Sequence, residues 1–116
     1  MTRFDTSPGS NVCRAFDLLG KRWTGLILAL LADGPMRFNE LLRAVPGLSD
    51  RVMTERLREL AAAGLVERRV DAGPPTAITY GLTAAGTAVG PVIDAVLQWA
   101  EVLPEPTTTR SASRSG

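Results

Sequence analysis

Residues 49–64 read SDRVMTERLRELAAAG, and this stretch predicts an amphipathic helix with both of its ends marked. Ser49 and Asp50 are residue types that cap helix N-termini, and Gly64 is the type that stops a helix at its C-terminus. The apolar residues fall on one stripe at helical spacing: Val52, Met53, Leu57, Leu60 and Ala61. The remaining side should therefore face solvent, and its residues are Asp50, Arg51, Thr54, Glu55, Arg58 and Glu59.

A shorter helix and a tight turn come before this stretch. Asn39 is a good N-cap for a helix over roughly residues 40–45, and residues 36–38 form a short extended piece before it. Pro46-Gly47-Leu48 then predicts the turn. Two helices joined in this way are typical of a helix-turn-helix.

A β-hairpin is predicted directly after the long helix. Residues 65–71 and 77–82 are rich in strand-forming types, and they flank AGPPT at residues 72–76. A hairpin in this position is a wing. The predicted fold class is therefore mainly α with a small β-hairpin, a winged helix-turn-helix.

The rest of the chain completes one domain. Ser10 or Asn11 should cap a first helix that runs to about Leu19, and residues 23–32 are apolar nearly all round, which predicts a buried helix. Thr83 should cap a last helix that Pro91 kinks or restarts. We expect a flexible N-terminal arm at 1–9, the domain at 10–103, and a disordered tail at 104–116, where no large apolar residue occurs.

Composition disfavours enzymes and metal sites. The 116 residues contain no histidine and one cysteine, so imidazole-dependent catalytic triads and His-ligated or Cys-clustered zinc are excluded. We expect no catalytic residues, no metal and no cofactor. The apolar stretch at 23–32 is about half of the ~20 residues that a membrane span needs, and no secretory signal is visible. We therefore expect a cytoplasmic protein without a membrane partner.

Charge is distributed unevenly along the chain, although the net charge is only +1. Residues 37–69 hold seven arginines and five acids, whereas residues 70–106 hold four acids and no basic residue. The two halves should therefore face different partners, and the arginine-rich half suits phosphate.

Double-stranded DNA is the partner that this pattern favours. A helix fits the major groove, and Arg51 is the best candidate for a base contact because an arginine can bond guanine through two parallel hydrogen bonds. Ser49 and Thr54 suit phosphate or adaptable contacts, and Arg68 and Arg69 should reach the sugar-phosphate backbone beside the groove. The full set of candidate DNA-binding residues is Arg37, Asn39, Ser49, Asp50, Arg51, Thr54, Arg58, Arg68, Arg69 and Thr76.

Two alternatives remain open from the residues alone. Arginines interleaved with Glu55, Glu59 and Glu67 also occur on helix faces that are merely solvated and ion-paired. A winged helix can also serve as a protein–protein interaction module without DNA binding. Such a module should present aromatic or leucine side chains where this chain has arginines, so DNA binding is favoured.

Several motifs of the chain resemble the HxlR-type family of MarR-like bacterial regulators. They are Cys13, DLLGKRWT at 17–24, DGPMRFNEL at 33–41, PGLS at 46–49, RVMTERLREL at 51–60, GLVER at 64–68, Pro74-Pro75, Tyr80, Leu82-Thr83, Gly86, Pro91 and Trp99. The resemblance covers about residues 13–101. It implies a homodimeric repressor or activator whose N- and C-terminal helices form the dimer interface. Many such relatives carry a basic residue in the wing where this chain has Thr76 and Ala77.

The last helix independently favours a homodimer, because it has more apolar surface than one packing partner would cover. The expected interface residues are Val89, Val92, Ile93, Val96, Leu97 and Ala100. A twofold dimer would place two recognition helices roughly 34–36 Å apart, which matches the half-sites of an inverted-repeat operator.

The signal is the least determined feature. The resemblance implies that Cys13 senses oxidants or electrophiles, and a thiol in the first turn of a helix lies near the positive end of the helix dipole. Against this, free cysteine often acts as a small buried hydrophobe. The other hypothesis is a small-molecule effector in a cavity lined by Phe16, Trp23, Tyr80 and Trp99, although aromatics at such spacings more often belong to an ordinary core.

Overall fold

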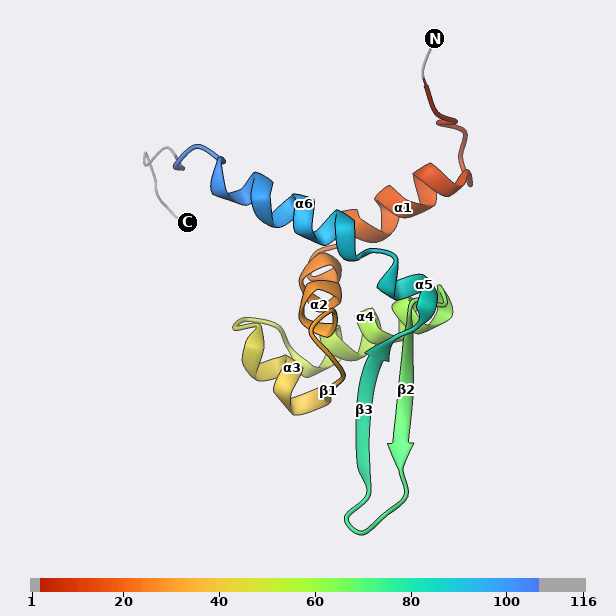
Figure 1. The fold of residues 1–116 in the computed structure, drawn as a ribbon, viewed down its shortest axis with the longest axis vertical. Helices are drawn as coiled ribbons and strands as arrows, with labels where there is room; N and C mark the ends of the chain where they lie inside the picture. Colours follow the sequence, from red (N-terminus) through yellow and green to blue (C-terminus); the bar gives the residue numbers. More distant parts are fainter. Residues whose placement is uncertain (1–2, 107–116) are drawn as a thin grey trace.

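The computed structural model describes residues 3–106, and these form a group of helices from which a small antiparallel sheet projects (Figure 1). The tail prediction falls mostly on residues 107–116, which lie outside the described residues. The elements are α1 Asn11–Gly20, α2 Thr24–Leu31, β1 Met36–Arg37, α3 Phe38–Ala44, α4 Asp50–Ala62, β2 Val66–Asp71, β3 Ala77–Leu82, α5 Ala84–Thr87 and α6 Gly90–Glu101.

The core is built where α2 meets the helix-turn-helix pair α3 and α4. Its largest fully buried side chains are Ile27, Leu28, Leu41, Met53 and Leu60, which come from these three helices. Burial of each such side chain stabilises the fold by about 1.5–3 kcal/mol. The predicted apolar stripe of α4 is thus confirmed for Met53, Leu57 and Leu60, which are buried. Val52 is half-buried, and Ala61 at the end of the stripe is exposed.

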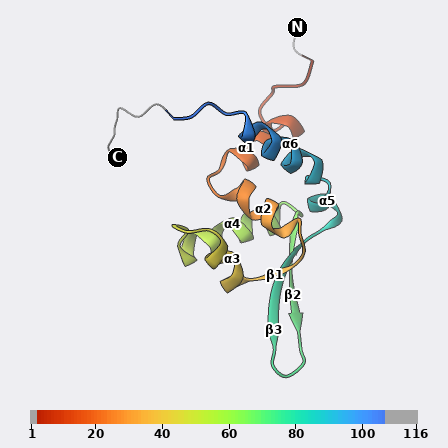
Figure 2. The same cartoon turned by 60° about the vertical axis from the view of Figure 1, so that its left-hand side comes forward.

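The sheet has three strands in the order β1-β3-β2, one more than the predicted hairpin. β2 pairs with β3 from Val66↔Leu82 to Asp71↔Ala77, and β1 adds the pairs Met36↔Tyr80 and Arg37↔Thr79. The hairpin projects away from the helices in both ribbon views (Figures 1 and 2). β1 therefore anchors the base of the wing to the start of α3.

The structure selects Ser10 and Ser49 from the paired cap candidates Ser10 or Asn11 and Ser49 or Asp50, and it confirms Thr83. The Ser10, Ser49 and Thr83 hydroxyls accept hydrogen bonds from the backbone N–H groups of residues 13, 52 and 86. The predicted cap at Asn39 is wrong. α3 already begins at Phe38, because the Glu40 carboxylate accepts a hydrogen bond from the Arg37 N–H at 2.7 Å and so closes the first turn.

The last helix is split in two, and Pro91 restarts it rather than kinking it. Thr83 caps the short α5, and α6 begins at Gly90 with the proline in its first turn, where a missing N–H costs nothing. Gly86 is required in α5, because a Cβ there would overlap the carbonyl oxygen of Leu65. Among the residues that the structure describes, no helix is long and apolar enough to cross a membrane.

Candidate DNA-binding surface

The outward side of α4 presents Arg51 as a highly exposed arginine. The Arg51 side chain is 82% exposed, and its guanidinium lies 3.5 Å from the Glu55 carboxylate one turn later. An exposed pair of this kind is worth less than about 1 kcal/mol. The ion-paired interpretation therefore holds for Arg51, although the pair is too weak to hold its guanidinium firmly.

Ser49 and Thr54 differ in what their hydroxyls can still do. The Ser49 hydroxyl accepts the Val52 N–H at 3.1 Å, so its own O–H remains available to donate. The Thr54 hydroxyl donates to the carbonyl oxygen of Asp50 at 2.9 Å. Thr54 would have to give up that hydrogen bond before donating to a phosphate. The Asp50 carboxylate lies in the first turn, where it complements the helix dipole.

A hollow of about 230 Å³ separates α4 from the wing, and two arginines line it. Arg58 lies on α4, whereas Arg68 lies on β2 opposite Tyr80 in the sheet register. Both are exposed, and neither has an acidic partner within 4 Å in the described part of the chain. Their positive charge is therefore uncompensated beside the outward face of α4.

Arg69 lies on the opposite face of the sheet from Arg68, because successive side chains of a strand alternate. The Arg69 guanidinium donates to the Glu67 carboxylate at 2.8 Å and lies against the position where Gly81 lacks a Cβ. The expectation that Arg68 and Arg69 act together beside the groove is therefore corrected. Arg68 lies on the face of the sheet next to α4, whereas Arg69 lies on the other face and binds Glu67.

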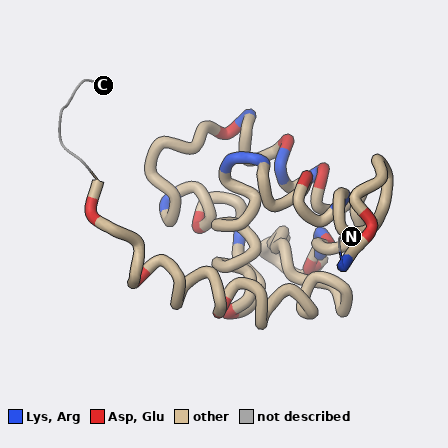
Figure 3. Tube along the Cα trace, turned by 90° about the horizontal axis from the view of Figure 1, so that it is seen from above, with Lys and Arg blue, Asp and Glu red and all other residues tan. Residues whose placement is uncertain are grey.

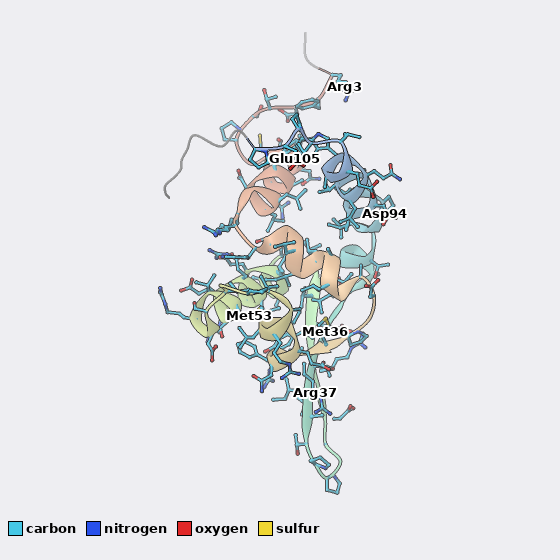
Figure 4. All side chains as sticks on the ribbon, turned by 90° about the vertical axis from the view of Figure 1, so that its left-hand side faces the viewer. Arg3, Met36, Arg37, Met53, Asp94 and Glu105 are labelled. Carbon is cyan, nitrogen blue, oxygen red and sulfur yellow. The ribbon has the colours of Figure 1, made fainter. Side chains whose placement is uncertain are left out.

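A second hollow, of about 360 Å³, lies between α3 and the start of β3, next to the turn of the wing. Arg37, Asn39 and Thr76 all line it, as does Arg43. Figure 4 shows Arg37 where α3 meets the sheet, far from Asp94 on α6. Sequence reasoning missed Arg43, although its spacing of four residues from Asn39 places both on one face of a helix.

Not every arginine of the basic half is free. The Arg56 guanidinium bonds the Glu59 carboxylate at 3.0 Å and the carbonyl oxygen of Arg22 at 3.2 Å, and Lys21 bonds Glu59 at 3.0 Å. The hydrogen bond from Lys21 holds the pKa of Glu59 below its ordinary value of 4.5, with Arg56 contributing in the same direction. This cluster fastens the α1–α2 corner to α4.

The comparisons with known proteins agree with this geometry. The HxlR-like helix-turn-helix family profile matches residues 18–107. The chain belongs to this family. The HTH-type transcriptional regulator YodB of Bacillus subtilis is 42% identical over 105 residues, which cover 87% of this chain and 94% of YodB.

Solved structures give the same result. The reduced form of YodB from B. subtilis superposes with a TM-score of 0.76 at 41% identity, covering 89% of this chain and 99% of that one. The redox regulator HypR in its oxidized form gives a TM-score of 0.77 at 33% identity, covering 84% and 100%. This member of the HxlR-like family is a DNA-binding transcriptional regulator with the winged helix fold, and the interaction-module alternative is not favoured.

The four aromatic residues predicted to form one effector cavity do not come together. The Phe16 and Trp99 side chains are 67% and 61% exposed, on α1 and α6. Trp23 lines a groove between α2 and α6, whereas Tyr80 faces α4 from the sheet. The expected cavity is therefore corrected, because the four residues belong to different parts of the fold.

Trp23 occupies an unusual position between two elements. Its backbone adopts φ 81°, a left-handed conformation rare for a bulky residue. The Arg22 guanidinium stacks 4.5 Å from the centre of the indole ring. The far edge of the ring would lie 3.9 Å from a Cβ at Gly47, in the turn between α3 and α4.

The predicted dimerisation residues in and just before α6 differ in their exposure to solvent. Val92, Val96, Leu97 and Ala100 are exposed, and Val89 is half-buried. Ile93 is only 7% exposed because it packs into the protein's own core, so its placement at an interface is corrected. The exposed apolar surface also includes Trp99, Val102 and Leu103. In Figure 3, the α6 trace carries acidic positions and no basic one.

Cys13 lies in the first turn of α1 and is half-buried. Its backbone N–H bonds the Ser10 hydroxyl, and its Sγ lies 3.4 Å from the carbonyl oxygen of Thr6. The thiol is thus in the predicted helical position but is in contact with residues of the N-terminal arm.

Proposed function

We propose that this regulator binds an inverted-repeat operator in double-stranded DNA as a homodimer, with α4 of each protomer in the major groove. One observation carries the proposal: among residues 3–106, exposed arginines with no acidic partner within 4 Å lie on α4, on the wing, on β1 and on α3. Arginines in such an arrangement suit a polyanion, because each phosphate contact releases a condensed counterion.

Within this surface the arginines have different roles. Arg51 is highly exposed on α4 and reads a base edge, since its ion pair with Glu55 is weak. Arg58 and Arg68 bind phosphates on the wing side, and Arg37 and Arg43 bind phosphates on the α3 side. The remaining polar candidates, Ser49, Asp50, Asn39 and Thr76, border these contacts.

The exposed apolar side of α6 forms the dimer interface in this proposal. Val92, Val96 and Leu97 are between 43% and 56% exposed, and an apolar patch of this kind on a monomer marks an interaction site. Leu97→Glu should therefore dissociate the dimer in sedimentation experiments. Val70→Glu, at an equally exposed position on the wing, is the matched control and should leave the dimer intact.

Selection of bound fragments from a pool of random duplexes tests the main proposal. We expect recovery of a two-part site with half-sites one helical turn apart, and binding that weakens steeply with salt. Failure to bind any duplex at low ionic strength would refute the proposal. Recovery of a single unrepeated half-site would refute the dimer.

The second proposal concerns the signal, and Cys13 carries it. The half-buried thiol lies in the first turn of α1, a helix that the family resemblance implies for the dimer interface, where modification would disturb the dimer. The related structures include YodB in its reduced, diamide-treated and quinone-bound forms and HypR in its oxidized form. In this chain, diamide would take two electrons and two protons from the Cys13 thiols of two protomers and leave a disulfide. A quinone would instead add one thiol across its ring double bond.

Comparison with Cys13→Ser protein tests this response. Treated wild-type protein should leave its operator, whereas Cys13→Ser protein should stay bound, and intact-mass measurement should show the disulfide-linked dimer or the adduct. Equal release of both proteins would refute a role for the thiol.

A further inference from the structure

A carboxylate lies at the centre of the outward face of α4. Between residues 52 and 60 of this helix, only Glu55 and Arg58 are exposed, and Arg51 is exposed one turn before Glu55. Spacings of four and three residues place Arg51, Glu55 and Arg58 in one line along the helix. The Glu55 side chain is 45% exposed. The face that α4 would turn to the major groove therefore carries an acid between two arginines.

The other two acids of α4 have roles within the protein. Asp50 lies in the first turn, where it complements the helix dipole, and the Glu59 carboxylate accepts a hydrogen bond from Lys21. Glu55 differs, because its one ion pair in the described part of the chain is with Arg51. That pair is exposed and weak, so Glu55 contributes little to the stability of the fold.

A carboxylate in this position restricts which duplexes bind well. Once Arg51 bonds a guanine, the Glu55 carboxylate loses its partner, and a charge that loses its water without gaining a partner is costly. Phosphate oxygens and the O6 and N7 atoms of guanine are acceptors, so they cannot replace that partner. Adenine has an amino group in the major groove with the N7 acceptor beside it, whereas cytosine presents only the donor. Cytosine is therefore the base that suits Glu55.

We propose that Glu55 is a specificity-determining residue whose carboxylate accepts a hydrogen bond from the 4-amino group of a cytosine, beside the guanine that Arg51 contacts. On the operator, the two side chains exchange their ion pair for these two base contacts. On other sequences the carboxylate faces acceptors, and binding is weaker. The inference rests on the proposed function, because it requires α4 to lie in the major groove.

Selection from random duplexes with wild-type and variant proteins tests this role. Glu55→Ala should lower the preference for that cytosine about fivefold or more. It should also bind random-sequence duplexes more tightly, since a negative charge is removed from the DNA-facing side. Glu59→Ala is the matched control on the same helix, and it should retain the cytosine preference because Glu59 faces the α1–α2 corner. Operators selected by the wild type without a cytosine beside the guanine would overturn the inference.

A modified base tests the contact itself. When 2-pyrimidinone replaces the cytosine of the operator, the 4-amino group is absent. Wild-type protein should bind this duplex more weakly than the natural operator, and Glu55→Ala protein should lose less affinity, so the difference between the two losses measures the contact. Equal losses would overturn the inference. So would a Glu55→Ala protein that loses only its guanine preference, because Glu55 would then merely position Arg51.

Failure of this inference is distinguishable from failure of the proposed function. Wild-type protein that binds no duplex would refute both. Wild-type protein that selects a two-part operator, with a cytosine preference unchanged in Glu55→Ala, would refute the role of Glu55 and leave the proposed function standing.

Discussion

Arg68 and Arg69 are neighbours in sequence but lie on opposite faces of the wing, so they should contribute differently to DNA binding. Arg68 faces α4 and has no acidic partner within 4 Å in the part of the chain that the structure describes, whereas Arg69 is bonded to Glu67. We expect Arg68→Gln to weaken binding and to reduce its salt dependence. Arg69→Gln should change neither, which makes it a control matched in residue type and strand.

The magnitude follows from counterion release. Each phosphate contact adds about 0.9 to the slope of log affinity against log salt, so losing one contact from each protomer of the proposed dimer should reduce the slope by about 1.8. When the salt concentration rises fourfold, the affinity of both proteins for DNA should fall. The fall should be roughly twelvefold larger for the wild type than for the Arg68→Gln protein. Fluorescence anisotropy with a labelled operator, read at several salt concentrations, measures both slopes. An equal reduction for Arg69→Gln would refute the assignment of the two faces.

Three further predictions concern α4, the base of the wing and the α1–α2 corner. Arg51→Ala should relax preference at one base position of each half-site, at a cost of about 1–3 kcal/mol for the preferred base, which selection from random duplexes would detect. Thr83→Ala should lower the free energy of unfolding by about 2 kcal/mol, because it removes a helix cap and the hydrogen bond to the carbonyl oxygen of Gly64, and urea titration would measure the loss. The folded-state pKa of Glu59 is lowered, so its ion pairs stabilise the fold above pH 4.5 and are lost as the pH falls below that value. Acidification should therefore lower the free energy of unfolding less in Lys21→Met than in the wild type, and urea titrations on both sides of pH 4.5 would measure the difference.

The local signals of the sequence predicted most of the elements. Ser10, Ser49 and Thr83 cap helices as their residue types predict, and the apolar spacing of α4 identifies its buried stripe. Asn39 misled the prediction because the Glu40 carboxylate closes the first turn of α3 from inside the helix. When a side chain inside the helix supplies the capping hydrogen bond, the N-cap position itself needs no Ser, Thr, Asp or Asn. Arg37 is therefore an N-cap that residue type does not reveal.

Features that depend on long-range packing could not be predicted from the sequence. β1 joins the sheet through pairs such as Met36↔Tyr80, which are far apart in the chain. Ile93 and Val92 are adjacent and similar, yet only the rotation of α6 against α2 decides that Ile93 is buried and Val92 exposed. For Arg68 and Arg69, strand alternation already separates the two side chains, but the partner of each depends on the tertiary fold.

The contact between Gly86 and Leu65 has a practical consequence for protein engineering. Gly86 fits against the Leu65 carbonyl because it lacks a Cβ, and Thr83 bonds backbone atoms of residues 64 and 65 from the same turn. Chimaeras that exchange α6 between relatives should therefore be joined after this turn, near Ala88, so that residues 83–86 stay with the β2 they were fitted to. A junction placed earlier would combine residues 64–65 of one protein with residues 83–86 of another, and these two segments would not have evolved to pack against each other.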